Sequence, residues 1–140
     1  MGRNYTELSL DAFKAEHRIA DNRITLYVDD ENQKDIFEVL ANYNKHLQVV
    51  LFWMLKGLHN YHDDYYGNED FSEETEGIHA MKFKTEGQNF RIYCREFFND
   101  DNTKKKVIMA YAFHKKSEGI DKKLRRLLKA IGEYDYEITW

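Results

Sequence analysis

The sequence contains no proline, a single cysteine and no long hydrophobic run. The lone Cys94 excludes an internal disulfide, and the lack of disulfides is typical of a reducing compartment, so we expect a cytoplasmic protein. The longest apolar stretch, "LQVVLFWML" at Leu47–Leu55, is much shorter than the roughly 18 residues of a membrane span. We therefore expect no association with a membrane.

What is present is the composition of a folded domain with an uneven distribution of charge. The 140 residues are 42% hydrophobic and 15% aromatic, which is enough to build one core and excludes a disordered chain. Residues 1–77 hold 7 Lys/Arg against 16 Asp/Glu, whereas residues 78–131 hold 14 against 6. This asymmetry favours a polyanionic partner for the basic part, although the two halves could equally neutralise each other across the folded surface.

Hydrophobic periodicity predicts one domain at residues 23–140, preceded by a polar extension at residues 1–22 with a short helix near Ser9–His17. Within residues 23–140, alternation and turn residues predict four strands, and 3.6-residue spacing predicts three helices. Along the chain we expect a strand at Arg23–Asp30, a helix that runs from a cap at Asn32 to Asn42, and a helix at Asn44–Asn60. A solvated loop at Tyr61–Gly77 follows. We then expect strands within 77–85, 89–98 and 105–115, and a last helix that contains Leu124–Ile131. The predicted fold is α+β, in the order β-α-α-β-β-β-α: a small antiparallel-rich sheet backed by a helical hairpin and a C-terminal helix.

Period-two geometry places several basic residues on one face of this sheet. If the apolar side chains face the helices, the other face is open, and the third hairpin strand adds basic residues at its end. The residues predicted to share the open face are Lys82, Lys84, Arg91, Tyr93 and Arg95, with His114, Lys115 and Lys116 beside them. A wet sheet face with solubilising Lys and Arg is the structural alternative.

Such a surface suits single-stranded RNA, because cations bind phosphates and Tyr93 can stack on an unpaired base. It also suits RNA cleavage without a metal. Attack of a 2′-hydroxyl on its own phosphate needs a base, an acid and clustered cations, and His114 can serve as acid or base.

Three segments resemble the RelE/HigB/ParE toxin superfamily, in particular its HigB-like, phage-derived branch. They are "MKFKTEGQNFRIYCREF", "VIMAYAFHKK" and "DKKLRRLLKAIGEY", and with the predicted element order the resemblance covers about Arg23–Tyr136. In HigB-like members a His often occupies the position of Tyr111. Such toxins are usually basic, whereas this chain has a net charge of −4.

The resemblance implies the toxin component of a type II toxin–antitoxin system: a ribosome-dependent, metal-independent mRNA endonuclease without a cofactor, paired with a proteic antitoxin. Carried over by position, it implies catalytic roles for His114, Lys82 and Arg91. It implies substrate-binding roles for Lys84, Tyr93, Arg95, Lys115 and Lys116. The alternative is a non-catalytic protein-binding module of the same fold, either a gyrase inhibitor or an inactive phage or mobile-element relic, which would not need these side chains to converge.

A second constellation is "HNYHDD" at His59–Asp64, at the end of a predicted helix. His59 and His62 are three residues apart and could share a metal ion, but a catalytic metal needs a third ligand. We expect a polar helix end and no metal site. Cys94 is expected to be a buried, unreactive side chain.

Overall fold

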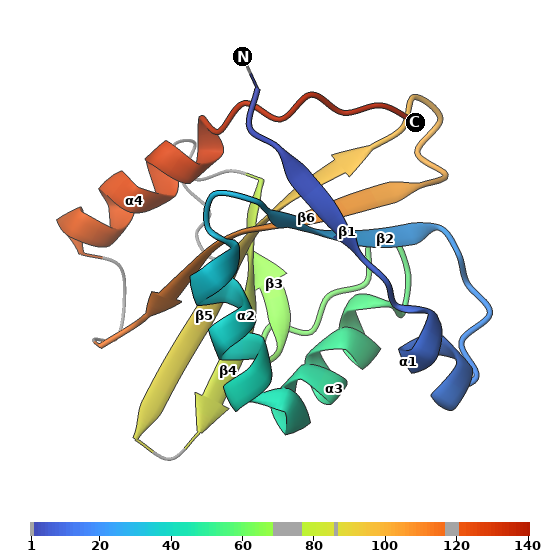
Figure 1. Ribbon diagram of the computed structural model, residues 1–140, viewed down its shortest axis with the longest axis horizontal. Helices are drawn as coiled ribbons and strands as arrows, with labels where there is room; N and C mark the ends of the chain where they lie inside the picture. Colours follow the sequence, from blue (N-terminus) through green and yellow to red (C-terminus); the bar gives the residue numbers. More distant parts are fainter. Residues whose placement is uncertain (1, 69–76, 86, 117–120) are drawn as a thin grey trace.

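The structure is a computed structural model that describes residues 2–68, 77–85, 87–116 and 121–140. In this part of the chain it contains a six-stranded mixed sheet and four helices, which confirms the α+β class (Figure 1). The strands are β1 (Tyr5–Leu8), β2 (Ile24–Asp29), β3 (Tyr66–Asn68), β4 (Ile78–Thr85), β5 (Gln88–Phe98) and β6 (Lys105–His114). The helices are α1 (Asp11–Glu16), α2 (Gln33–Asn42), α3 (Asn44–Met54) and α4 (Lys122–Gly132).

The strand order in the sheet is β1-β2-β6-β5-β4-β3. β2 pairs in parallel with β6, and all other neighbours are antiparallel, so the sheet is antiparallel-rich as predicted. The prediction that the third hairpin strand is central is confirmed, because β6 lies between β2 and β5. Its sequence explains this position: Val107 and Met109 are buried on one face while Ile108 and Ala110 are buried on the other.

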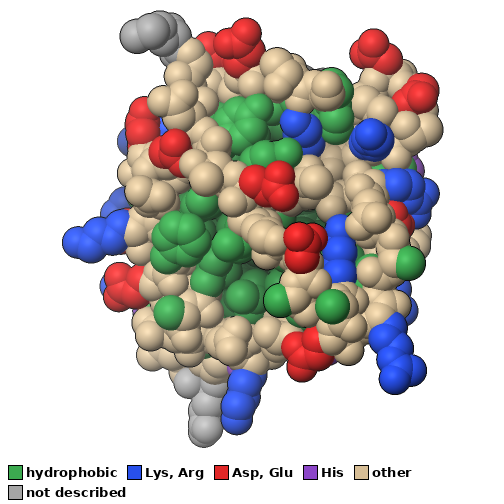
Figure 2. Space-filling view, turned by 45° about the vertical axis from the view of Figure 1, so that its right-hand side comes forward, with side chains coloured by type: hydrophobic (Ala, Val, Ile, Leu, Met, Phe, Trp, Pro, Cys, Tyr) green, Lys and Arg blue, Asp and Glu red, His purple; other side chains and the backbone are tan. Residues whose placement is uncertain are grey.

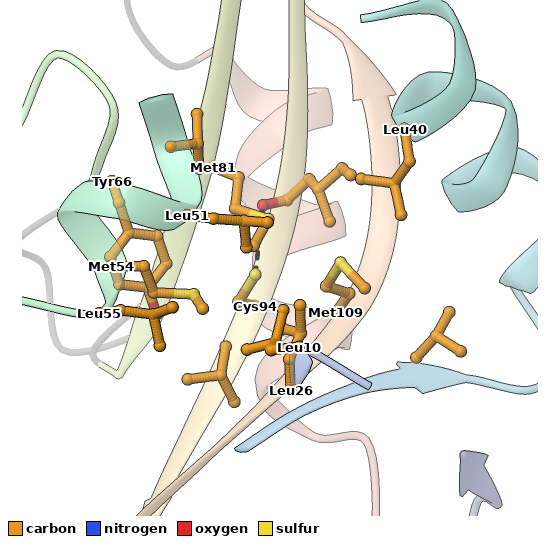
Figure 3. Packing of buried hydrophobic residues seen from close by; sticks show 14 of the residues in the cluster. Leu10, Leu26, Leu40, Leu51, Met54, Leu55, Tyr66, Met81, Cys94 and Met109 are labelled. Carbon is orange, nitrogen blue, oxygen red and sulfur yellow. Dashed lines mark hydrogen bonds between the residues drawn. The ribbon is translucent and has the colours of Figure 1, made fainter. Parts of the chain in front are cut away.

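Helices cover both faces of the sheet. On one face α2 and α3 pack on the larger core, where Leu51 and Met54 lie close to Met81 and Cys94 (Figure 3). On the other face α4 contributes an apolar stripe of Leu124, Leu128 and Ile131. The expectation of one open sheet face is therefore wrong. α4 was predicted to close the core, but the face that it covers is the one that carries the predicted basic residues.

Residues 1–22 were predicted to be an extension outside the domain, but most of this segment is part of the fold. β1 pairs with β2, and Leu10 and Phe13 belong to the larger core. The Arg3 guanidinium lies 2.7 Å from the fully buried carboxylate of Asp29. The Tyr136 hydroxyl donates to the same carboxylate at 2.6 Å. Because Asp29 ends β2, this carboxylate joins both ends of the chain to the sheet.

The segment predicted as a solvated loop, Tyr61–Gly77, contains a short strand. β3 pairs with β4, and Tyr66 is fully buried against the larger core. The acidic residues 69–76 of this loop lie outside the described residues. Cys94 is buried as predicted, and burial raises the pKa of its thiol well above the usual range, so the thiolate is disfavoured.

Candidate functional site

The five strand residues predicted to share a face do so, and they lie on the face of α4. Lys82 stands directly opposite Arg91 across the β4–β5 pair. Tyr93 stands opposite Ala80, which belongs to the small core beneath α4. Alternation along β4 and β5 places Lys84 and Arg95 on the same side. The period-two argument therefore assigned these side chains to one face correctly.

α4 and the segment after it close half of this face. Tyr93 is fully buried in the small core. The Arg95 guanidinium donates to the backbone carbonyls of Ile131 and Tyr134, each at 3.0 Å. Ile131 lies in the last turn of α4, and Tyr134 lies two residues beyond the end of the helix at Gly132. Arg95 thus holds the end of α4, and burial lowers its pKa. In this conformation neither Tyr93 nor Arg95 presents a surface on which RNA could bind.

The other half of the face, towards the β4–β5 turn, keeps basic side chains near solvent. Lys84 is exposed and Lys82 is half-buried, with its ammonium group donating to the carbonyl of Asp63. Arg91 is only 6% exposed, and its Nε donates to the side chain of Asn89. We call this region the basic end and define it by six residues: Lys82, Lys84, Arg91, Lys115, Lys116 and Lys123.

A cavity of about 270 Å³ lies at the basic end between the end of β6 and the start of α4. Lys115, Lys116 and Lys123 line it, together with Phe113 and His114. One carboxylate, Asp121, also lines it, and this group is engaged because it accepts the backbone N–H of Leu124 as the N-cap of α4. Among the described residues that line the cavity, positive charges therefore outnumber negative ones, as a phosphate site requires.

His114 does not meet Lys82 and Arg91 on one face. It stands opposite Phe90, and the two rings stack with centroids 4.2 Å apart and planes 12° apart. Phe90 packs against the α2–α3 core, so the imidazole lies on the side of the sheet away from Lys82 and Arg91. The predicted convergence of the three proposed catalytic side chains is absent from this conformation.

A β-bulge explains this difference. Tyr93 pairs with Tyr111, but the next residue, Cys94, pairs with Met109, so Ala110 is an extra residue in β6. Ala110 and Tyr111 consequently both pack towards α4, and the alternation is inverted from there to the end of the strand. Without the bulge His114 would point to the face of Lys82. An apolar run such as "VIMAYAF" does not reveal where an extra residue sits, because both faces are apolar.

Sequence reasoning missed a buried polar cluster on the α3 face, centred on Glu96. The Glu96 side chain is 3% exposed and lies 3.1 Å from the ammonium group of Lys105, which is fully buried. The hydroxyls of Tyr61 and Tyr66 donate to the two oxygens of the same carboxylate. The fifth member is His79, whose Nε2 lies 3.6 Å from Glu96. Lys105 alternates with Val107 and Met109 and therefore lies on the same buried face of β6. A lysine at the start of this apolar alternation was the feature of the sequence that could have indicated the cluster.

Burial controls the protonation of this cluster. Loss of hydration lowers the pKa of Lys105, although the Glu96 carboxylate raises it in part. Burial likewise lowers the pKa of His79, while Glu96 raises it and Lys105 lowers it further. Burial raises the pKa of Tyr66 well above its usual range. The cluster is a closed ion pair with neutral donors around it, which is the arrangement of a structural network.

The "HNYHDD" segment holds its two histidines against aromatic rings. His59 stacks on Phe98 and His62 lies beside Trp53, with centroids 5.0 and 4.5 Å apart respectively. Among residues 2–68, 77–85, 87–116 and 121–140, no group of three or more His, Cys, Asp or Glu is placed to hold a metal ion. In the same residues no helix has the length and apolar character to cross a bilayer.

The surface charge is mixed as well as clustered. On the face shown in Figure 2, basic and acidic side chains alternate around apolar ones. This view agrees with the interpretation that the acidic and basic halves of the chain partly neutralise each other. The basic end is therefore a local feature and not part of a uniformly basic molecule.

Comparisons with known proteins do not place the chain in a family: no family model, no curated protein and no solved structure matches it.

Proposed function

We propose that this protein is the toxin component of a toxin–antitoxin pair, related to the RelE/HigB/ParE superfamily, and that it binds and cleaves mRNA on the ribosome. Two features support the proposal. The segment from β2 onward follows the element order β-α-α-β-β-β-α, apart from the short β3. The segments that resemble the superfamily fall on β4–β5, β6 and α4. Its partners would be a proteic antitoxin, the ribosome and mRNA.

The observation that carries the RNA-directed part is the basic end. Lys82 and Arg91 are direct cross-strand neighbours, which concentrates two positive charges at this end of the sheet. Lys115 and Lys116 line the adjacent cavity at the end of β6. Phosphate contacts from Lys and Arg supply most of the affinity for single-stranded RNA and also stabilise the charge of a pentacoordinate phosphorane. In this proposal Lys82, Lys115 and Lys116 hold the scissile phosphate, and the buried Arg91 adds positive charge beside Lys82.

A role for His114 as acid or base requires a conformational change. Its ring stacks on Phe90 on the far face, although the residue also lines the cavity of the basic end. Rotation of the imidazole past the end of the strand would bring it to the phosphate held by Lys115 and Lys116. Such a rotation costs the stacking contact with Phe90.

The second candidate is a non-catalytic protein-binding module of the same superfamily, such as a gyrase inhibitor or an inactive phage-derived relic. The placement of His114 and the burial of Tyr93 and Arg95 favour it. A module of this kind would need neither convergence of side chains nor access for RNA. The two candidates differ in whether the basic end is needed for the effect on cells.

Inducible expression of the wild type and of Lys82→Ala, Lys116→Ala and His114→Ala variants, with growth and mRNA cleavage as readouts, tests the proposal. Lys34→Ala, an exposed lysine on α2, is the matched control. We expect arrest and cleavage for the wild type and the control, and loss of both in Lys82→Ala. Arrest without cleavage would support the protein-binding module. The absence of both, in a host whose ribosome is compatible, would contradict the toxin proposal.

A further inference from the structure

A second cavity, of about 220 Å³, lies between α2 and the ends of β5 and β6, on the face of the sheet opposite the basic end. Its lining combines aromatic rings with acidic and amide groups. This combination is the opposite of a phosphate site. It points to a cationic ligand, and each part of the lining contributes to that conclusion.

Three of the aromatic rings that line the cavity contact one another. The Phe90 ring stacks on His114 at 4.2 Å and lies 5.2 Å from the ring of Tyr43, measured between centroids. Phe90 and Tyr43 pack against the α2–α3 core, which fixes their orientation. The outer face of such a stack attracts a cation, because the face of an aromatic ring carries partial negative charge.

Two carboxylates on α2 also line the cavity. Asp35 and Glu38 are three residues apart and therefore lie on the same side of the helix. Both are exposed, and neither side chain makes an ion pair or hydrogen bond with any of the residues that the structure describes. The amide of Asn42, one turn further along α2, completes the polar lining. The carboxylates are thus available to a ligand.

We propose that this cavity binds the guanidinium group of an arginine side chain presented by a partner protein. A guanidinium is planar and stacks on aromatic faces, and its fork of N–H donors matches a carboxylate, whereas an ammonium group does neither. The volume is below the roughly 300–1,000 Å³ of sites for drug-sized ligands, which fits one side chain and not a larger molecule. The inference goes beyond the proposed function, because the site lies on the other face and takes a ligand of opposite charge.

The test is an NMR titration of ¹⁵N-labelled protein with the blocked tripeptide Gly-Arg-Gly. Binding is measured from the chemical shifts of the amide signals of Asn42, Phe90 and His114. The matched probe is Gly-citrulline-Gly, which has the same shape without the charge. We expect saturable shifts with the arginine peptide only. Asp35→Asn/Glu38→Gln should weaken binding by about fivefold or more, since each exposed charge contact contributes modestly. Removing the outer ring in His114→Ala should also weaken it.

The control is Glu7→Gln/Glu16→Gln, which removes two exposed carboxylates of β1 and α1 and leaves the cavity unchanged. It should bind the arginine peptide as the wild type does. Equal binding of the citrulline peptide, equal weakening in the control or no saturable shift at these three residues would each overturn the proposal. A lysine tripeptide that binds as tightly as the arginine peptide would overturn the choice of a guanidinium.

Discussion

Lys105 and Lys82 belong to strands on either side of β5 in the same sheet, but the structure treats their charges in opposite ways. Lys105 is fully buried on the α3 face, where its ammonium group binds Glu96 and donates to the carbonyl of Leu58 at 2.9 Å. Lys82 is half-buried on the α4 face beside Arg91. The first charge is compensated by the protein itself, whereas the second belongs to a group of like charges at the molecular surface. The structure thus compensates one lysine charge in the interior and leaves the other beside further positive charge at the surface.

The largest expected effect comes from breaking the Glu96 cluster. Glu96→Ala leaves the Lys105 ammonium buried without its carboxylate, and removal of one member of a buried ion pair costs about 3–5 kcal/mol. Urea unfolding at neutral pH measures this loss. The double variant Glu96→Gln/Lys105→Met, which removes both charges, should recover much of the stability. A loss below about 1 kcal/mol in Glu96→Ala would show that the cluster is not a closed ion pair.

The second prediction concerns Asp29, the other buried carboxylate. Tyr136→Phe removes the hydroxyl that donates to Asp29 and should lower the free energy of unfolding by about 1–2 kcal/mol, because the carboxylate loses one of its donors. Tyr134→Phe is the matched control: its ring lies 3.8 Å from the Arg3 guanidinium, and that contact survives the change. Equal losses in the two variants would show that the hydrogen bond from Tyr136 to Asp29 contributes no specific stability.

The third prediction is a pH dependence that arises from His79. Because burial lowers its pKa in the folded state, the unfolded chain binds a proton more readily, and stability must fall as the pH drops below the ordinary histidine value of about 6.5. We expect a loss of up to about 1 kcal/mol between pH 7.5 and 5.5. Denaturant unfolding across this range should show a shallower slope for His79→Gln. His59→Gln, which removes an exposed histidine, is the matched control. A slope that is unchanged in His79→Gln, or that changes equally in both variants, would refute the assignment.

The smallest effect on stability is expected at the basic end. Lys84→Ala/Lys116→Ala changes two exposed side chains and should alter the free energy of unfolding by less than about 0.5 kcal/mol. Under the proposed function it should weaken binding of single-stranded RNA and reduce the slope of log affinity against log salt by about 0.7 for each lost phosphate contact. Lys34→Ala/Lys104→Ala, also two exposed lysines, should change neither quantity. If the slope of log affinity against log salt is unchanged in the test variant, the basic end does not contact the phosphates of the RNA.

Much of the fold was predictable because the apolar spacing in the central elements is strong. β2, α2, the β4–β5 hairpin and β6 appear close to their predicted positions. β1 was not predicted, since "YTEL" has no buried side chain and is held by backbone pairing with β2. α3 ends at Met54, before the predicted Asn60. β3 was not predicted, because it lies in an acidic segment without apolar alternation. Its buried Tyr66 donates a hydrogen bond to Glu96, which lies about thirty residues later in the sequence.

The candidate site was predictable only in part. Alternation correctly assigned Lys82, Lys84, Arg91, Tyr93 and Arg95 to one face, because side-chain period in a strand is a local property. The sequence by itself therefore determined which residues share a face, and also that β6 is central. Tertiary structure alone decided that α4 closes half of this face and that the extra residue Ala110 turns His114 to the other side. The physical reason is that a bulge and a helix docking depend on packing between distant segments, which no local period encodes.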